Sequence, residues 1–257
     1  MPLLIGTSGW QYRSWRETFY PSGMPQARWL EHYADRFQTL EVNNAFYRLP
    51  EARTFTDWAR RTPDDFLVGV KMSRYLTHVR RLRQPAEPVK LFLSRARHLG
   101  AKLGPVLLQL PPTLRADIPA LAATLDRFPS AVRVAVELRH ESWFTDETAA
   151  LLADHGTALC WADGPKLRTP LWRTADWGYV RFHEGRATPH PCYGRAALTT
   201  WARRLADTWG EDADVFAFFN NDERGCAVRD ATVLAAAARR TGLSPTRVPE
   251  TGEVRVR

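Results

Sequence analysis

Eight short apolar segments of strand length recur along the sequence, and most stretches between them have the residue spacing of amphipathic helices. The strand-like segments are Leu3–Ser8, Thr39–Asn43, Leu67–Met72, Val106–Leu110, Val132–Leu138, Ala158–Trp161, Gly178–Phe182 and Val215–Phe219. The helical segments are Ala27–Arg36, Thr54–Arg61, Pro88–Gly100, Ile118–Phe128, Asp146–His155, Leu198–Trp209 and Arg229–Arg240. Such alternation is typical of a parallel sheet covered by helices. Eight units in 257 residues predict an α/β protein with a single (β/α)8 TIM-barrel domain over 1–257.

The connections between these segments argue against two nucleotide-binding folds. A Rossmann domain needs a GxGxxG turn after a strand, but here tryptophan follows GTSG, and no GxxxxGK[ST] phosphate loop occurs. The connections 9–25 and 184–197 are long, and long loops in compact domains are often binding loops. Both follow a predicted strand, so they are expected at the C-terminal face of the barrel. The connection 162–177 lacks a helical pattern, and 241–257 predicts an extended tail.

Composition limits the environment and the partners of the chain. No run of ~18 uncharged apolar residues predicts a transmembrane helix, and the N-terminus lacks the pattern of a signal peptide. Three widely spaced cysteines without a CxxC motif favour free thiols in a reducing cytoplasm and argue against structural zinc. The net charge of +8 favours anionic partners, although heavy arginine use is also typical of GC-rich coding sequences. The oligomeric state stays open.

A polar side chain ends or follows nearly every predicted strand. These residues are Glu41, Lys71, Gln109, Glu137, Asp163, Arg181 and Asn221. In a TIM barrel the C-terminal ends of the strands form the active-site face, so the pattern predicts a site there. Alternation along the strands turns three pairs inward: Glu41 with Asn43, Glu137 with Arg139, and Arg181 with His183. An internal lattice of salt bridges is the competing interpretation, because buried charges must be paired.

Seven segments together resemble one family. They are GTSGWQYRSWRETFYP (6–21), FQTLEVNNAFYRLP (37–50), KMSRYLTHVRRL (71–82), LGPVLLQLPP (103–112), VAVELRHESWF (134–144), YVRFHEG (179–185) and FFNND (218–222). In this order they are similar to the bacterial and archaeal DUF72 family, also called YecE-like. The resemblance implies a TIM barrel and no established activity. Its recurrent polar positions fall on Trp10, Glu41, Asn43, Tyr47, Lys71, Thr77, His78, Gln109, Glu137, Arg139, His140, Trp143, Asp163, Arg181, His183 and Asn220. The chain departs from the family's RxHG pattern by the inserted Glu184.

The mixed acid–base character of these positions favours a phosphate-bearing substrate, which includes nucleic acid. Arginine binds phosphate oxygens in a bidentate manner, and histidine exchanges protons near neutral pH. The expected catalytic residues are Glu41, Glu137, His183 and Asp163. The expected substrate-binding residues are Trp10, Asn43, Tyr47, Lys71, His78, Gln109, Arg139, His140, Trp143, Arg181, Asn220 and Asn221. If the protein is an enzyme, the hypothesis is a phosphoester hydrolase.

Three other interpretations stay open. Glu41 and Glu137 could be the paired carboxylates of a glycoside hydrolase, with aromatic residues as sugar platforms. The same barrel could bind an anionic metabolite or RNA without catalysis. A divalent metal on the acidic residues is a minor alternative, because no HxH, HExxH or DxD pair marks a strand end and three cations share the mouth. No cofactor is predicted.

Overall fold

The structure is a computed structural model that describes residues 2–165, 167–210, 213–250 and 252–254. Its strands are β1 (Pro2–Thr7), β2 (Thr39–Val42), β3 (Leu67–Lys71), β4 (Leu103–Gln109), β5 (Val134–Glu137), β6 (Ala158–Gly164), β7 (Leu167–Arg168), β8 (Gly178–Phe182), β9 (Val215–Phe219) and β10 (Ser244–Pro245). The sheet runs in the order β10-β1-β9-β8-β6-β5-β4-β3-β2, and all of these strands are parallel. The short β7 pairs with β6 in antiparallel orientation.

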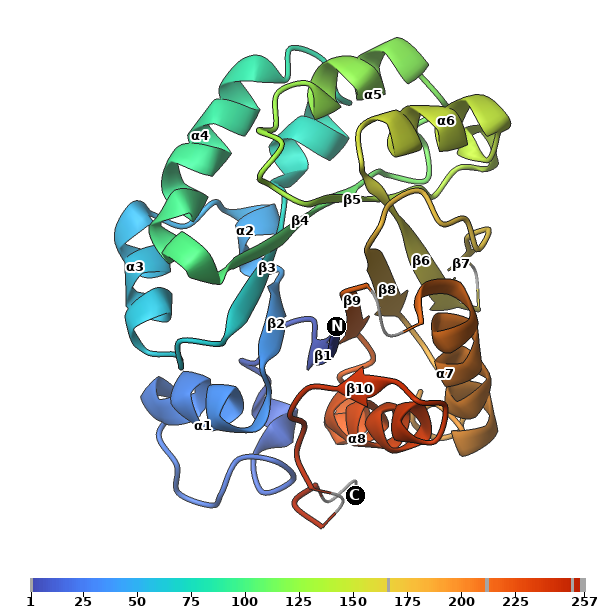
Figure 1. The fold of residues 1–257 in the computed structure, drawn as a ribbon. Helices are drawn as coiled ribbons and strands as arrows, with labels where there is room; N and C mark the ends of the chain where they lie inside the picture. Colours follow the sequence, from blue (N-terminus) through green and yellow to red (C-terminus); the bar gives the residue numbers. More distant parts are fainter. Residues whose placement is uncertain (1, 166, 211–212, 251, 255–257) are drawn as a thin grey trace.

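Helices surround the curled sheet on its outer side (Figure 1). They are α1 (Trp29–Arg36), α2 (Asn44–Tyr47), α3 (Ala52–Arg60), α4 (Ala86–Ala96), α5 (Ile118–Leu125), α6 (Asp146–Asp154), α7 (Arg195–Trp209) and α8 (Cys226–Arg239). A π-helical turn, Tyr75–Val79, follows β3. The eight predicted strands and the seven predicted helices are all present, so the parallel α/β prediction is confirmed.

The curled sheet comes round on itself at β1 and β2, and no continuous ladder joins these two strands. A single parallel bridge, between Ser8 and Glu41, joins these strands. The Tyr33 hydroxyl also links them, because it accepts a hydrogen bond from the backbone N–H of Thr7 (3.0 Å) and donates one to the carbonyl oxygen of Thr39 (3.1 Å). Glycine is needed at position 6, since a Cβ there would lie 2.4 Å from the Thr39 oxygen. The sheet therefore curls almost into a barrel, with a seam instead of a continuous eight-stranded ladder.

Side-chain alternation separates the interior of the sheet from its outer core. A small buried cluster fills the interior; it includes Leu4, Leu107, Ala135, Cys160, Tyr179 and Phe218. A much larger core lies between the strands and the helices, with residues such as Ile5, Val70, Val136 and Val180. The polar residues Glu41, Gln109, Glu137 and Arg181 are buried above the apolar interior cluster, towards the strand C-termini. The interior is thus apolar at one end and charged at the other.

Two short strands were not predicted. The connection 162–177, where no helix was expected, carries β7, which folds back onto β6. In the predicted tail, β10 extends the sheet beyond β1, and the backbone N–H of Thr246 donates to the Leu3 oxygen (2.9 Å). Arg247 then forms an ion pair with Asp65 (2.7 Å). Residues 251 and 255–257 of this segment lie outside the described residues.

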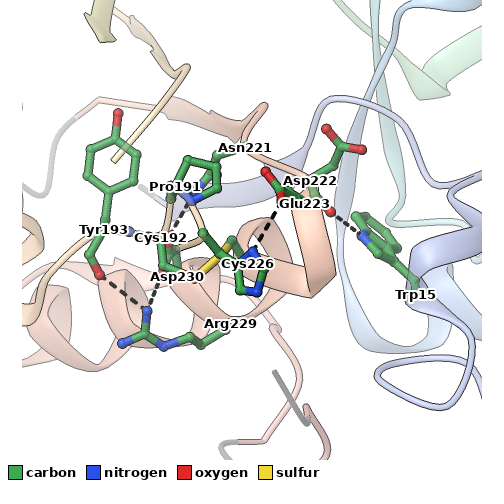
Figure 2. The surroundings of a disulfide bond; sticks show 11 residues. Trp15, Pro191, Cys192, Tyr193, Asn221, Asp222, Glu223, Cys226, Arg229 and Asp230 are labelled. Atoms are coloured by element: carbon green, nitrogen blue, oxygen red, sulfur yellow. Dashed lines mark hydrogen bonds and ion pairs between the residues drawn. A yellow bond between two sulfur atoms is a disulfide. The ribbon is translucent and has the colours of Figure 1, made fainter. Parts of the chain in front are cut away.

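The expectation of three free thiols is wrong for two of the cysteines. Cys192, in the loop between β8 and α7, forms a disulfide with Cys226, the first residue of α8 (Figure 2). Chain spacing did not indicate this, because 34 residues separate the two and only the fold brings them together. Cys160 is free and buried. No helix among the described residues has the length and apolar character to span a membrane.

Candidate functional site

Arg181 on β8 is the centre of the charged end of the interior. Its side chain is 1% exposed, and its two terminal nitrogens bind two different carboxylates. Nη2 lies 2.9 Å from Glu41 Oε1, and Nη1 lies 2.6 Å from Glu137 Oε2. Burial without partners would strongly disfavour any of these charges, so the three groups depend on one another. Arg181 therefore cross-links β2, β5 and β8 from inside the sheet.

Glu137 on β5 lies among two guanidinium groups and an imidazole. Besides Arg181, the Arg139 guanidinium lies 2.6 Å from Oε1, and His183 Nε2 lies 3.3 Å from the same oxygen. The His183 contact lacks hydrogen-bond geometry, and Nε2 has no hydrogen-bond partner among the described residues. Burial raises the pKa of Glu137, but Arg181, His183 and Arg139 outweigh burial and hold that pKa well below its usual range. Glu137 is therefore a carboxylate at all physiological pH values.

Glu41 on β2 has one neutral partner in addition to Arg181. The Tyr179 hydroxyl donates a hydrogen bond of 2.6 Å to Glu41 Oε2. Burial and the Glu41 charge raise the pKa of Tyr179, so the phenol stays protonated and is a constant donor. Tyr179 was not among the expected site residues, although it shares the inward side of β8 with Arg181. Its position two residues before the arginine is the signal that could have identified it.

Lys71 at the end of β3 is a buried cation of a different kind. Its Nζ donates to Gln109 Oε1 (2.8 Å) and lies 4.0 Å from the ring centre of Phe46, which is a cation–π contact. Among the described residues it has no carboxylate within ion-pair distance, although it is only 8% exposed. Burial and the charge of Arg181 lower the pKa of Lys71 to about 8. Phe46 was not among the expected site residues, because nothing in the sequence distinguishes this apolar side chain from those of the core.

Several polar atoms around this end of the interior lack partners. Ser8 Oγ, Asn43 Oδ1, Arg181 Nε and His183 Nε2 are buried without a hydrogen bond among the described residues. Asn43 adjoins Ser8, since its Nδ2 lies 3.4 Å from the Ser8 carbonyl oxygen. Asn220 Nδ2 lies 3.3 Å from His183 Nδ1 and orients that ring. Buried polar groups in native proteins almost always have partners, so such a group of exceptions marks a place for water or a ligand.

Asp163 does not join this charged cluster. Its Oδ2 accepts a hydrogen bond from the Trp201 indole (3.0 Å), and its Oδ1 lies 3.6 Å from Arg168. β6 continues to Gly164, so alternation turns Asp163 to the outer side of the sheet, away from the inward-facing Cys160. The expected grouping of Asp163 with Glu41 and Glu137 is therefore corrected.

The hydrogen bonds of three further expected residues, Asn221, Trp143 and His140, are to groups outside the charged cluster. The Asn221 amide donates to the Pro191 oxygen and to Asp230 Oδ2, close to the disulfide (Figure 2). The Trp143 indole is buried and donates to the Leu114 oxygen (2.8 Å). His140 Nδ1 accepts a hydrogen bond from the backbone N–H of Ser142, and His140 thereby caps the short helix Glu141–Trp143. In each case the contacts are those of a residue that holds a loop or a helix end.

The remaining expected residues divide between the core and the rim. Trp10 is buried, edge-on to Trp58, whereas Tyr47 is 75% exposed at the end of α2. His78 is half-buried, edge-on to Phe46, and its Nδ1 lies 2.9 Å from Thr77 Oγ1. Burial and the charge of Lys71 lower the pKa of His78 to about 4, so its imidazole is neutral near pH 7.

No group of three or more His, Cys, Asp or Glu side chains is placed to hold a metal ion within the described part of the chain. The charged end contains three basic side chains and two carboxylates. The basic residues are Lys71, Arg139 and Arg181, and the acidic residues are Glu41 and Glu137. Their formal sum is +1 when Lys71 is protonated. Such a site suits a small anion better than a neutral molecule.

Comparison with known proteins identifies the family. The chain is 25% identical to the UPF0759 protein YunF of Bacillus subtilis (strain 168), with 88% of this chain and 90% of YunF covered. It superposes on a crystal structure of a DUF72 family protein from Thermotoga maritima MSB8 with a TM-score of 0.82, 27% identity and coverage of 93% and 100%. A DUF72 family protein from Enterococcus faecalis V583 shares the fold at a TM-score of 0.78 and 17% identity, with 96% and 98% covered. The family model described as "Protein of unknown function DUF72" matches residues 4–253, so the chain belongs to the DUF72 family.

Proposed function

We propose that the curled sheet acts as a TIM-type barrel whose C-terminal mouth binds a phosphate-bearing ligand. The observation that supports this most directly is Lys71, a buried ammonium without a carboxylate partner among the described residues. Burying a charge is costly unless it is paired, so the native site is expected to supply a negative charge from outside the chain. Arg139, whose side chain is 27% exposed, is the second ligand-facing cation.

In this proposal Arg181 is a positioning residue. It was expected to hold phosphate, but both of its terminal nitrogens are already bound by Glu41 and Glu137. The bridge fixes Glu137, which in turn fixes the Arg139 guanidinium at 2.6 Å. Lys71 is fixed by Gln109 on the neighbouring strand β4. The buried network thus holds two cations in place for an anion, and this preorganisation reduces the cost of binding.

His183 is the residue best placed for acid–base chemistry on such a ligand. Its Nδ1 adjoins Asn220, and its Nε2 is free of hydrogen bonds among the described residues and lies beside Glu137. Proton transfer to a leaving oxygen by a positioned histidine is a usual part of phosphoester hydrolysis. We therefore propose phosphoester hydrolysis as the reaction, with simple binding as the alternative. Hydrolysis is supported if the protein releases phosphate or alcohol from phosphoesters and His183→Gln loses this activity but keeps its affinity for the ligand. Simple binding is supported if the protein binds the phosphoester and releases neither product.

The glycoside hydrolase alternative is less well supported by this geometry. One of its two carboxyl groups must be protonated at working pH, which requires a raised pKa. The pKa of Glu137 is instead held well below its usual range, and both Glu137 and Glu41 are completely buried against Arg181. These carboxylates have the contacts of structural ion-pair partners.

Replacement of Lys71 by methionine tests the anion site. We expect Lys71→Met to weaken binding of sulfate and of nucleoside phosphates by at least about tenfold, because a charge-assisted contact is worth roughly 1.5–3 kcal/mol. The fold should be as stable as before or more stable, since the lowered pKa of Lys71 shows that the buried charge costs free energy at neutral pH. Calorimetric titration and thermal unfolding measure both effects. Lys90→Met, at an exposed position of α4, is the matched control.

The pH dependence of binding provides a second test. Because burial lowers the pKa of Lys71 to about 8, the ammonium loses its proton as the pH rises through that value. Sulfate, which keeps its charge between pH 6 and 9.5, is therefore expected to bind progressively more weakly above pH 8. Lys71→Arg should bind sulfate without this decline. A flat profile for the unmodified protein would show that Lys71 does not contact the anion.

A further inference from the structure

The chain from the last residue of β3 onward is rich in basic residues. Residues 71–84, here called the basic segment, contain one lysine and four arginines, and no acidic residue occurs between Asp65 and Glu87. Arg80 and Arg81 bind neutral oxygens, those of Tyr75, Gln84 and Thr113. Arg74 and Arg83 are exposed, and none of the four arginines forms an ion pair with a described residue. The segment therefore presents uncompensated positive charge.

The backbone of the basic segment is held in an unusual shape. It contains the π-helical turn Tyr75–Val79, a conformation that is frequent at functional sites. Three of its non-glycine residues then have positive φ: Arg81 (52°), Leu82 (65°) and Gln84 (51°). Such strain persists only where the surroundings enforce it, and it clusters at sites that clamp ligands. The buried side chain of Leu82 anchors this turn, so the arginines project from a defined framework.

Two exposed tyrosines lie beside these charges. Tyr47, 75% exposed, is edge-on to Phe46 at 5.1 Å, and Phe46 is the ring that contacts Lys71. Tyr75 is 46% exposed, and the Arg80 guanidinium lies 5.3 Å from its ring centre. An exposed aromatic ring beside a cation is the arrangement on which unpaired nucleobases stack. Tyr47 thus adjoins the proposed anion site, and Tyr75 lies further along the basic segment.

A groove continues from this surface between the basic segment, α4 and α5. Its volume is about 770 Å³, and its lining includes Tyr75, Arg80, Gln84, Leu91 and Arg127, with one carboxylate, that of Glu87. Leu91 is half exposed, which gives the groove an apolar wall beside two arginines. Tyr75 and Arg80 belong to both the groove and the basic segment, so the two surfaces are continuous.

We infer that this continuous surface binds a single-stranded nucleic acid. One backbone phosphate lies at Lys71 and Arg139, an adjacent base stacks on Tyr47, and the strand continues over the basic segment into the groove at Tyr75. A single strand fits because stacking on these rings requires bases that are not paired. An acidic peptide would match the charges but would leave the exposed rings without a role. The inference rests on the proposed function for the phosphate at the mouth and adds the class of its ligand.

The test uses fluorescence anisotropy with labelled 12-nucleotide oligo(dT) and oligo(rU) at several NaCl concentrations. For Arg74→Ala/Arg83→Ala/Arg127→Ala we expect at least tenfold weaker binding and a salt slope reduced by about 2, since each phosphate contact on a single strand contributes roughly 0.7. Tyr47→Ala should weaken binding by about tenfold with an unchanged slope. The matched control is Arg97→Ala/Arg239→Ala/Arg240→Ala, at exposed positions on other elements.

The outcomes separate this inference from the proposed function. Sulfate binding that depends on Lys71, together with oligonucleotide binding that ignores the arginine and tyrosine variants, would overturn the inference and leave the anion site. Oligonucleotide binding that depends on those variants but not on Lys71 would support the basic surface and refute the phosphate at the mouth. Equal binding of poly-glutamate, with the same dependence on the arginines and none on Tyr47, would reveal a general polyanion surface and overturn the nucleic-acid assignment.

Discussion

Arg181→Met is expected to lower the free energy of unfolding by about 3–5 kcal/mol, because it leaves two completely buried carboxylates without their shared cation. For a protein of 257 residues this corresponds to a fall in Tm on the order of 10 °C. Thermal and urea unfolding at neutral pH measure the change. Methionine fills much of the volume of the arginine side chain, so the loss reports charge pairing more than packing.

Two variants make the cause of this effect identifiable. Arg181→Met/Glu41→Gln/Glu137→Gln removes all three charges and should recover a large part of the lost stability, since neutral groups cost less to bury than unpaired charges. Arg133→Met breaks the partly exposed pair of Arg133 with Asp214 and should change stability by less than about 1 kcal/mol. If the triple variant were no more stable than Arg181→Met, packing and not charge would explain the loss.

The same network determines the response of the fold to acid. In the folded state the pKa of Glu137 is depressed, so its contribution to stability is complete above the ordinary carboxyl pKa and is lost as the pH falls through the folded-state value. Removal of Arg181, the cation that lowers the pKa of Glu137 most, raises that folded-state value. The Arg181→Met variant should therefore lose stability at a higher pH than the unmodified protein.

Side-chain alternation was enough to place the core of the candidate site from the sequence. Glu41, Glu137 and Arg181 were all expected to face inward, and all three do. Asp163 was placed at the site by a different argument, its position after a strand that was expected to end at Trp161, and this placement was wrong. β6 in fact continues to Gly164. A polar residue beyond a strand end can point into the mouth, whereas one within a strand must follow the alternation.

Which inward groups pair with one another depended on the register of the sheet. Lys71 has a carboxylate, Glu41, on the neighbouring strand β2, yet its hydrogen-bond partner is Gln109 on β4. Lys71 is in register with Leu107, so Gln109 lies two residues further along the same side of β4. Glu41 is instead bound by Tyr179 and Arg181 on β8, across the interior. Contacts across the interior of a curled sheet have no counterpart in sequence spacing.

The loop between β8 and α7 was predicted as a binding loop, but its attachment to α8 was not foreseen. The disulfide Cys192–Cys226 is one of several links between them (Figure 2). The backbone N–H of Tyr193 donates to Asp230 Oδ2 (2.7 Å), and Asn221 binds both that oxygen and Pro191. The Tyr193 hydroxyl in turn donates to the Asp163 carbonyl oxygen at the end of β6. The loop that begins next to His183 is therefore held from two sides.

Loss of the disulfide is expected to destabilise the protein by about 2–4 kcal/mol. The bond closes a loop with a sequence separation of 34, for which the chain-entropy relation gives about 4 kcal/mol, and measured values are often smaller. Cys192→Ser/Cys226→Ser should lower Tm by roughly 4–8 °C. A thiol reductant should do the same to the unmodified protein and have no effect on the double variant.

Cys160→Ala provides the matched control for this experiment, because it removes the buried free thiol and leaves the disulfide intact. It should remain sensitive to the reductant.

If the bond mainly restricts the unfolded chain, the double variant should bind sulfate with unchanged affinity, since Lys71 and Arg139 are held by β4 and β5. If the bond instead holds the loop in place at the mouth, sulfate affinity should fall along with Tm. Only the oxidised protein has the cross-link. If the oxidised, reduced and double-variant proteins had the same Tm, the disulfide would therefore not stabilise the fold.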